Sequence, residues 1–154
     1  MSQEEDLDML IQMADSGYAE AQSKLGARYY FGSGVVKNYV IAVEWWQKAA
    51  EQGHTTAQFN LGRCYYYGEG VIQDKIIAVE WWKKSAEQGN AIAQFYLGRC
   101  FGEGIGVELN ELDEAEWYTK AAIQGHKEAQ FNLADMYFHG RGVLEDKTLA
   151  FFWY

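Results

Sequence analysis

The chain has 154 residues, of which 49% are hydrophobic and 16% aromatic, and its formal net charge is −9. This apolar content is ample for a packed core and excludes a disordered chain. The negative charge repels phosphate backbones, so we expect no nucleic-acid partner. The sequence contains no run of 18 apolar residues, so we expect no membrane insertion. The acidic opening sequence lacks the basic region of a secretory signal, so we expect a cytoplasmic protein.

An internal repeat organises the whole sequence. The pattern Gly-x-x-x-Ala-Gln starts at Gly17, Gly53, Gly89 and Gly125, each 36 residues after the last. Leu-Gly, a glycine pair followed by Val, and an aromatic pair then recur in the same phase. The period predicts one repeat domain over 1–154, divided into a half repeat at 1–16, repeats at 17–52, 53–88 and 89–124, and a partial repeat at 125–154.

Each repeat is predicted to be a helix–turn–helix hairpin. In the second repeat, Ala57, Leu61, Cys64 and Tyr65 have helical spacing and predict a first helix over about 55–67. The glycine pair ends it, and Asp74 is suited to cap the second helix. The equivalent caps in the other repeats are Asn38, Asn110 and Asp146. We therefore expect nine helices.

The combination of Ala-Gln-x-x-Leu-Gly, Gly-x-Gly-Val and Ala-x-x-Trp-Trp in a 36-residue hairpin resembles the Sel1-like repeat (SLR) family, a relative of the tetratricopeptide (TPR) repeats. The resemblance implies an all-α, right-handed superhelical solenoid and a role as a scaffold or adaptor that holds proteins together. Two features depart from the family pattern: the chain contains no Pro, and Glu114 takes the place of an Ala in the third repeat. We expect the second helix of that repeat to start or sit differently.

Several other kinds of site are disfavoured. The glycine pairs join two helices, whereas a phosphate-binding loop follows a strand. Cys64 and Cys100 are expected to be reduced core thiols, and His54, His126 and His139 lie in or near turns, where no set of three convergent metal ligands is predicted. We therefore expect no metal and no cofactor. No catalytic grouping is present, so we expect no enzyme; a lactam hydrolase, as attributed to cysteine-rich relatives, is the least favoured alternative.

The concave face formed by the first helices is the predicted partner-binding groove. Arg63 and Arg99 stand 36 residues apart on an otherwise aromatic face, and a pair of guanidiniums in register suits a peptide carboxylate. The recurring Phe residues on this face are equally what packing between neighbouring repeats would require. The predicted groove residues are Tyr30, Phe59, Arg63, Tyr66, Tyr67, Phe95, Arg99, Phe131, Asp135 and Phe138. The expected ligand is a peptide or helix of a protein partner.

A second function class is structural self-assembly. The sequence finishes with Phe151, Phe152, Trp153 and Tyr154, and terminal repeats of a solenoid need a polar cap for solubility. End-to-end stacking of two chains would bury that apolar surface.

Overall fold

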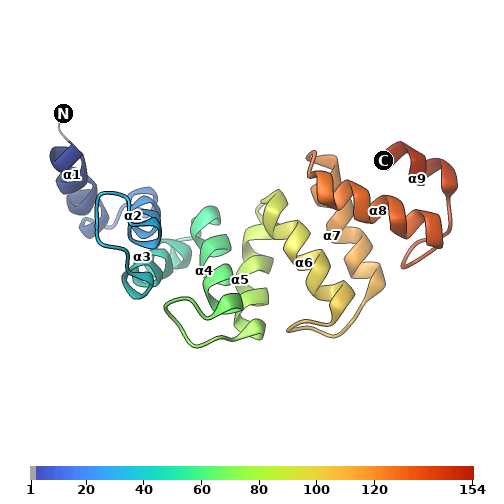
Figure 1. Ribbon diagram of the computed structural model, residues 1–154, viewed down its shortest axis with the longest axis horizontal. Helices are drawn as coiled ribbons and strands as arrows, with labels where there is room; N and C mark the ends of the chain where they lie inside the picture. Colours follow the sequence, from blue (N-terminus) through green and yellow to red (C-terminus); the bar gives the residue numbers. More distant parts are fainter. Residues whose placement is uncertain (1–2) are drawn as a thin grey trace. The chain divides into compact units, whose positions relative to one another are not determined.

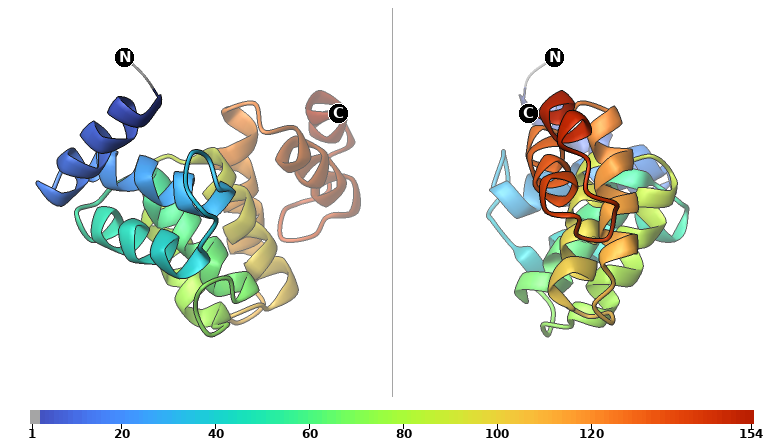
Figure 2. Two further views of the ribbon diagram at one scale, coloured as in Figure 1. Left: turned by 60° about the vertical axis from the view of Figure 1, so that its left-hand side comes forward. Right: turned by 90° about the vertical axis from the view of Figure 1, so that its right-hand side faces the viewer.

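The computed structural model describes residues 3–154, with side chains from Asp6 onward; Met1 and Ser2 of the predicted first half repeat lie outside the described residues. Nine α-helices and no strand are found in this part of the chain (Figures 1 and 2). The helices are α1 Gln3–Asp15, α2 Ala19–Phe31, α3 Tyr39–Glu51, α4 Thr55–Tyr67, α5 Lys75–Glu87, α6 Ala91–Glu103, α7 Glu111–Ile123, α8 Lys127–His139 and α9 Lys147–Trp153. The predicted first helix of the second repeat is confirmed as α4.

The glycine pair turns the chain from the first to the second helix of a hairpin. Gly68 has a left-handed backbone (φ 73°) and its N–H donates to the carbonyl of Cys64, which ends α4. Gly70 also has a positive φ, and a Cβ there would overlap the backbone carbonyl of Tyr39. A side chain at position 70 would thus prevent the loop from packing on the first turn of α3. The motif therefore sets both the turn and the stacking of one hairpin on the preceding one.

The predicted caps of the second helices are confirmed. Asp74 Oδ1 accepts from the backbone N–H of Ile76 at 2.9 Å and of Ile77 at 3.1 Å. Asn38, Asn110 and Asp146 accept in the same way at the start of α3, α7 and α9. Each cap satisfies backbone donors that the helix itself leaves unpaired.

The Gln of the Ala-Gln motif ties each first helix to the helix before it. The Nε2 atoms of Gln22, Gln58, Gln94 and Gln130 donate to the carbonyls of Ala14, Ala50, Ala86 and Ala122, respectively, at 3.0–3.2 Å. These carbonyls lie in the last turn of a second helix, where each also accepts from the backbone N–H of the Gly three residues later, so the Gln side chain is a second donor. The Gln side chain, buried in the first three repeats and partly buried at Gln130, thus recurs with the 36-residue period because it completes the end of the preceding helix.

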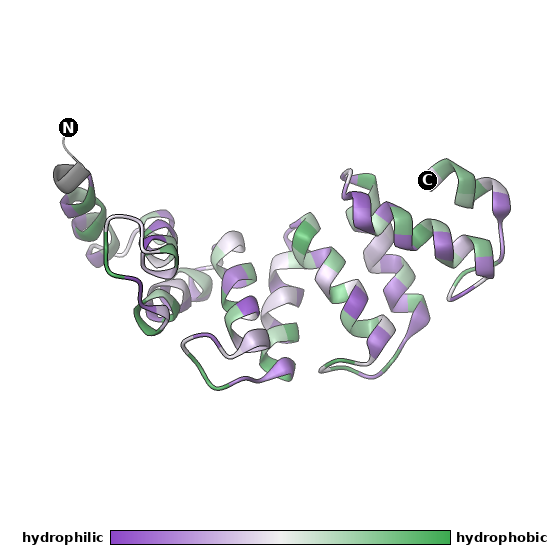
Figure 3. Cartoon of the chain, in the orientation of Figure 1, coloured by the Kyte–Doolittle hydropathy of each residue, from purple (hydrophilic) through white to green (hydrophobic). Residues whose placement is uncertain are grey.

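The Leu-Gly motif brings the two helices of a hairpin into close contact. A Cβ on Gly26 would lie 2.6 Å from Cδ1 of Trp46, and one on Gly98 would lie 2.8 Å from Cδ1 of Tyr118. Trp46 is fully buried, and its Nε1 donates to the carbonyl of Ser23 at 3.1 Å. The helices show mixed hydrophobic and hydrophilic colouring along their length, as expected when one face packs and the other meets solvent (Figure 3).

The chain divides into two compact units, Met1–Trp81 and Trp82–Tyr154, with the boundary inside α5. In the first unit the core is built from Trp46, Leu61 and Cys64 with small residues around them. In the second it is built from Tyr118, Leu133 and Met136. Each unit supplies its own buried centre and is described by itself.

The expected difference in where the second helix of the third repeat starts is wrong. The helix α7 begins and ends 36 residues after α5, as α5 does after α3. Glu114 is buried in α7, where Gly102 of α6 leaves room for its carboxyl group. None of the helices in the described part of the chain has the length and apolar character needed to cross a membrane.

Candidate functional site

A pocket of about 470 Å³ opens between the first helices of two successive hairpins in the second unit. Its lining residues come from α6 and α8 and are Phe95, Arg99, Lys127, Glu128, Phe131 and Asn132. Three of these were predicted from the sequence as groove residues. Two aromatic rings beside two cations give a surface that can take an apolar side chain next to an acidic one.

Phe95 is held in place by rings on both sides. Its ring stacks on His126 with centroids 4.6 Å apart and an interplanar angle of 19°, and it lies 5.8 Å from the ring of Tyr118. His126 is itself fixed because its Nδ1 accepts from the backbone N–H of Ala129 at the start of α8. Phe131, by contrast, is 60% exposed. One wall of the pocket is therefore packed into the fold, and the other presents a ring to solvent.

The charged residues of the pocket differ in how strongly they are held. Nε and Nη2 of Arg99 both donate to Glu103 Oε1 at 3.3 Å, one turn further along α6. Lys127 is exposed at the first position of α8. The two cations at the pocket thus stand beside two carboxylates, Glu103 paired with Arg99 and Glu128 in the pocket lining.

In the first unit, the predicted residues Tyr30 and Arg63 are in contact. The guanidinium of Arg63 lies over the ring of Tyr30 at 4.5 Å from the centroid. The phenol of Tyr30 donates to Glu69 Oε2 at 2.7 Å. Burial, and then this hydrogen bond, raise the pKa of Tyr30 to about 12, so the phenol stays protonated at neutral pH.

The remaining predicted groove residues take separate positions. Tyr66 and Tyr67 pack edge to face with centroids 4.9 Å apart, and Phe59 is half-buried in α4. Asp135 pairs with Arg141 at 3.2 Å and with His139 at 3.3 Å, so this carboxylate is engaged within the fold. The ring of Phe138 is 38% exposed. Since Arg63 belongs to the first unit and Arg99 to the second, their alignment in register stays a prediction.

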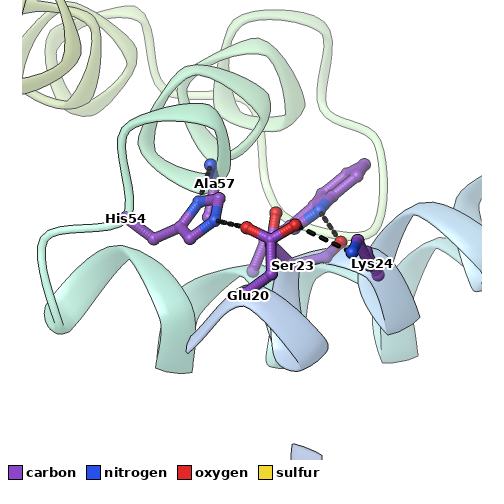
Figure 4. Close-up of polar contacts among 6 residues, drawn as sticks. Glu20, Ser23, Lys24, His54 and Ala57 are labelled. Atoms are coloured by element: carbon purple, nitrogen blue, oxygen red, sulfur yellow. Dashed lines mark hydrogen bonds and ion pairs between the residues drawn. The ribbon is translucent and has the colours of Figure 1, made fainter. Parts of the chain in front are cut away.

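The histidines at the start of α4 and α8 are helix caps. Nδ1 of His54 accepts from the backbone N–H of Ala57 at 3.2 Å, and Nε2 lies 2.9 Å from Glu20 Oε2 (Figure 4). Hydrogen bonds from His54 and Lys24 lower the pKa of Glu20.

Among the described residues, no group of three His, Cys, Asp or Glu side chains is arranged to hold a metal ion.

Both cysteines are buried, and neither is part of a disulfide. Burial raises the pKa of the Cys64 thiol to about 12, which disfavours the reactive thiolate. Both residues therefore contribute packing in the first helices, as predicted.

The repeat pattern decides the family. Four consecutive segments, 19–54, 55–90, 91–126 and 127–154, match the Sel1 repeat. The chain belongs to the Sel1 repeat family. The matched segments begin two residues after the boundaries predicted from the sequence and have the same 36-residue period. No curated protein matches the chain closely.

Solved Sel1 repeat structures share the fold. The chain is 43% identical to the protective antigen c5321 of uropathogenic Escherichia coli, with a TM-score of 0.92 over 96% of this chain and 32% of that one. It is 37% identical to a Sel1 repeat protein of Oxalobacter formigenes, with a TM-score of 0.93 over 98% of this chain and 62% of the other. The immunity protein Pa5087 of Pseudomonas aeruginosa, at 21% identity and a TM-score of 0.54, shares the fold alone. The chain thus spans about a third of the first relative and less than two thirds of the second.

These matches confirm the predicted all-α repeat fold. Sel1 repeat proteins generally mediate protein–protein interactions, and the family is generally a non-enzymatic scaffold.

Two features of the site were not predicted from the sequence. Lys127 and Asn132 line the pocket, although neither was among the predicted groove residues. The sequence does distinguish Lys127, because the equivalent positions 19, 55 and 91 hold the uncharged residues Ala, Thr and Ala. Nothing in the sequence indicates the hydrogen bond between Tyr30 and Glu69, since it depends on how two hairpins stack.

Proposed function

We propose that this Sel1 repeat protein is an adaptor that binds a peptide or helix of a partner protein on the face formed by its first helices. The observation that carries the proposal is the pocket between α6 and α8, where Phe95 and Phe131 lie beside Arg99 and Lys127. Aromatic residues and Arg are the types enriched at binding hot spots. An apolar residue of the partner would enter between the two rings, and an acidic neighbour would meet the cations.

Photo-crosslinking tests this proposal at a position that does not disturb the fold. A benzophenone amino acid replaces the exposed Phe131, and the same group replaces Leu144, which is 90% exposed in a loop, as the control. Proteins of the source organism crosslinked by each variant are identified by mass spectrometry. We expect one protein to be enriched at least tenfold by the position 131 probe over the position 144 probe.

A substitution then measures the contribution of the pocket to binding that protein. Phe131→Ala should weaken its affinity for the purified protein at least tenfold, the typical cost of truncating an aromatic hot spot. Leu144→Ala should leave the affinity unchanged. Equal crosslinking at the two positions, or equal affinities of the two Ala variants, would rule out the pocket as the binding surface.

We propose self-association as a second candidate, because α9 presents Phe151 and Phe152 with each ring 73% exposed. A second copy of the chain stacking on α9 would bury this apolar surface. Light scattering over a hundredfold range of concentration tests it. A mass that rises with concentration in the wild type and stays monomeric in Phe151→Ser/Phe152→Ser supports stacking, whereas a monomer throughout contradicts it.

A further inference from the structure

One edge of the Arg63 guanidinium has no hydrogen-bond partner. Nε and Nη2 of Arg63 are screened from solvent and make no hydrogen bond to the residues that the structure describes. These two atoms form the side of the planar fork that can hold a carboxylate with two parallel hydrogen bonds. A donor that has lost water and gained no acceptor is costly, and a buried group of this kind calls for an explanation.

Arg99, the equivalent residue 36 positions later, shows what this edge can bind. Its Nε and Nη2 both donate to Glu103 Oε1, at 3.3 Å each. Glu103 stands four residues after Arg99, whereas four residues after Arg63 the chain has Tyr67. The Nε–Nη2 edge of Arg99 in α6 is therefore paired with a carboxylate, whereas the equivalent edge of Arg63 in α4 is not.

The residues around Arg63 stack on the guanidinium and leave its Nε–Nη2 edge unpaired. The ring of Tyr30 supports the guanidinium plane at 4.5 Å. Glu69 lies beside them, but its Oε2 is occupied by the phenol of Tyr30 at 2.7 Å. Arg63 as a whole residue is only partly buried, so part of its side chain meets solvent.

We propose that Arg63 is a binding site for a carboxylate of the partner protein, supplied by an acidic side chain or by a chain terminus. The partner's carboxylate would take the place at Arg63 that Glu103 takes at Arg99, held edge-on with Tyr30 beneath the guanidinium. This inference rests on the proposed function, since it assigns an acidic group to the partner that the first-helix face binds.

The test follows the Nε–H resonance of Arg63 by NMR in ¹⁵N-labelled protein, with sodium acetate as the probe and sodium chloride at equal ionic strength as the control. We expect a saturable shift with acetate alone. Tyr67→Glu installs the missing internal carboxylate and should weaken acetate binding at least tenfold, whereas Tyr67→Gln, of similar size but neutral, should retain it. Tyr67 is 53% exposed, so both variants should fold.

Two peptides distinguish the sources of the carboxylate. One is blocked at both ends and contains a single Glu; the other is made of Ala and has a free C-terminus. Binding of either at Arg63 supports the proposal and names the source. Absence of a saturable shift with acetate, equal acetate binding by Tyr67→Glu and Tyr67→Gln, or binding of neither peptide would overturn it.

These measurements need no protein partner, so they separate the two proposals. If acetate does not bind while Phe131→Ala still weakens the partner, only the carboxylate site is wrong. If acetate binds as expected while the Phe131 and Leu144 variants behave alike, the carboxylate site stands and the α6–α8 pocket is the wrong surface.

Discussion

The carboxyl group of Glu114 in α7 occupies the space that Gly102 leaves open in α6: a Cβ at position 102 would overlap Cδ of Glu114 and lie 2.8 Å from its Oε2. In the other repeats Tyr30, Tyr66 and Phe138 stand in the place of Gly102, and Ala42, Ala78 and Ala150 stand in the place of Glu114. A large ring beside a small residue has thus been exchanged for a small residue beside a carboxylate.

The charged residues around Gly102 and Glu114 also differ from those at the equivalent positions of the other repeats. Asp135 stands where the second repeat has Arg63, and Arg141 stands where it has Glu69. Arg141 donates to Asp135 at 3.2 Å, and its Nη1 lies 4.0 Å from Oε2 of Glu114, which has no hydrogen-bond partner among the described residues. At the junction of the third and fourth repeats, charged groups therefore stand where the first unit has a stacked guanidinium and a phenol.

Glu114→Gln is expected to stabilise the protein at neutral pH. Burial raises the pKa of Glu114, Arg141 lowers it, and the neighbouring carboxylates of Glu111, Glu103 and Asp135 raise it further. The folded state thus holds the neutral acid better than the unfolded chain does. Stability is fully present below the unfolded pKa, near the ordinary value of 4.5, and is lost as the pH rises through the folded pKa.

Urea unfolding from pH 4 to pH 8 measures this effect. The free energy of unfolding of the wild type should fall with rising pH relative to Glu114→Gln, and the variant should be more stable by about 1 kcal/mol at pH 7, the order of the cost of a buried unpaired group. Glu116→Gln, an exposed change in the same helix, is the control. Parallel pH curves for wild type and Glu114→Gln would contradict the assignment.

A double-mutant cycle tests whether Gly102 and Glu114 act as a pair. Gly102→Tyr alone should destabilise the protein by about 1–3 kcal/mol because the ring competes with the carboxyl group for one space. Glu114→Ala alone opens a void beside Gly102. The double variant restores the pattern of the other repeats, so we expect a favourable coupling of at least about 1 kcal/mol in thermal or urea unfolding. Additive effects would show that the two sites are independent.

Gln94→Met should cost about 0.5–1.5 kcal/mol in the free energy of unfolding, since it removes one of the two hydrogen bonds to the carbonyl of Ala86, which also accepts from the N–H of Gly89. Gln94 donates to Ala86 at 3.1 Å and accepts from Gln124 Nε2 at 2.8 Å. Gln124→Met removes the bond to Gln94 and a long 3.5 Å bond to the carbonyl of Lys120, both made by an exposed residue. It is the matched control, with an expected cost below about 0.5 kcal/mol. Similar losses for the two variants in urea unfolding would argue against the role of the Ala86 contact.

Much of the fold was predictable because the 36-residue period repeats both the apolar positions and the caps. Asp74 and its equivalents follow from local chemistry, so the sequence alone predicts them as helix caps. The partner of Glu114 was not, because Gly102 lies twelve residues earlier in another helix and only packing brings them together. The different pairing of Arg63 and Arg99 could be predicted from the sequence, because the residue four positions later is Tyr67 after Arg63 and Glu103 after Arg99.

Gly98→Ala is expected to destabilise the protein although Ala favours a helix. A Cβ at position 98 would lie 2.8 Å from Cδ1 and 2.9 Å from Cε1 of Tyr118, which is 3% exposed and has no room to move away. Overpacking of this kind costs about 1–3 kcal/mol. It outweighs the gain of about 0.5–1 kcal/mol from replacing a helical Gly by Ala.

The matched control is Gly102→Ala in the Glu114→Ala background, one turn away in the same helix. There the new methyl group meets no carboxyl group, so only the helical preference remains and the variant should gain about 0.5–1 kcal/mol. Thermal unfolding compares each variant with its own parent. Opposite signs for the two Gly→Ala changes would establish that Gly98 is kept for the close approach of α6 to α7, and a stabilised Gly98→Ala would show that the contact with Tyr118 can relax.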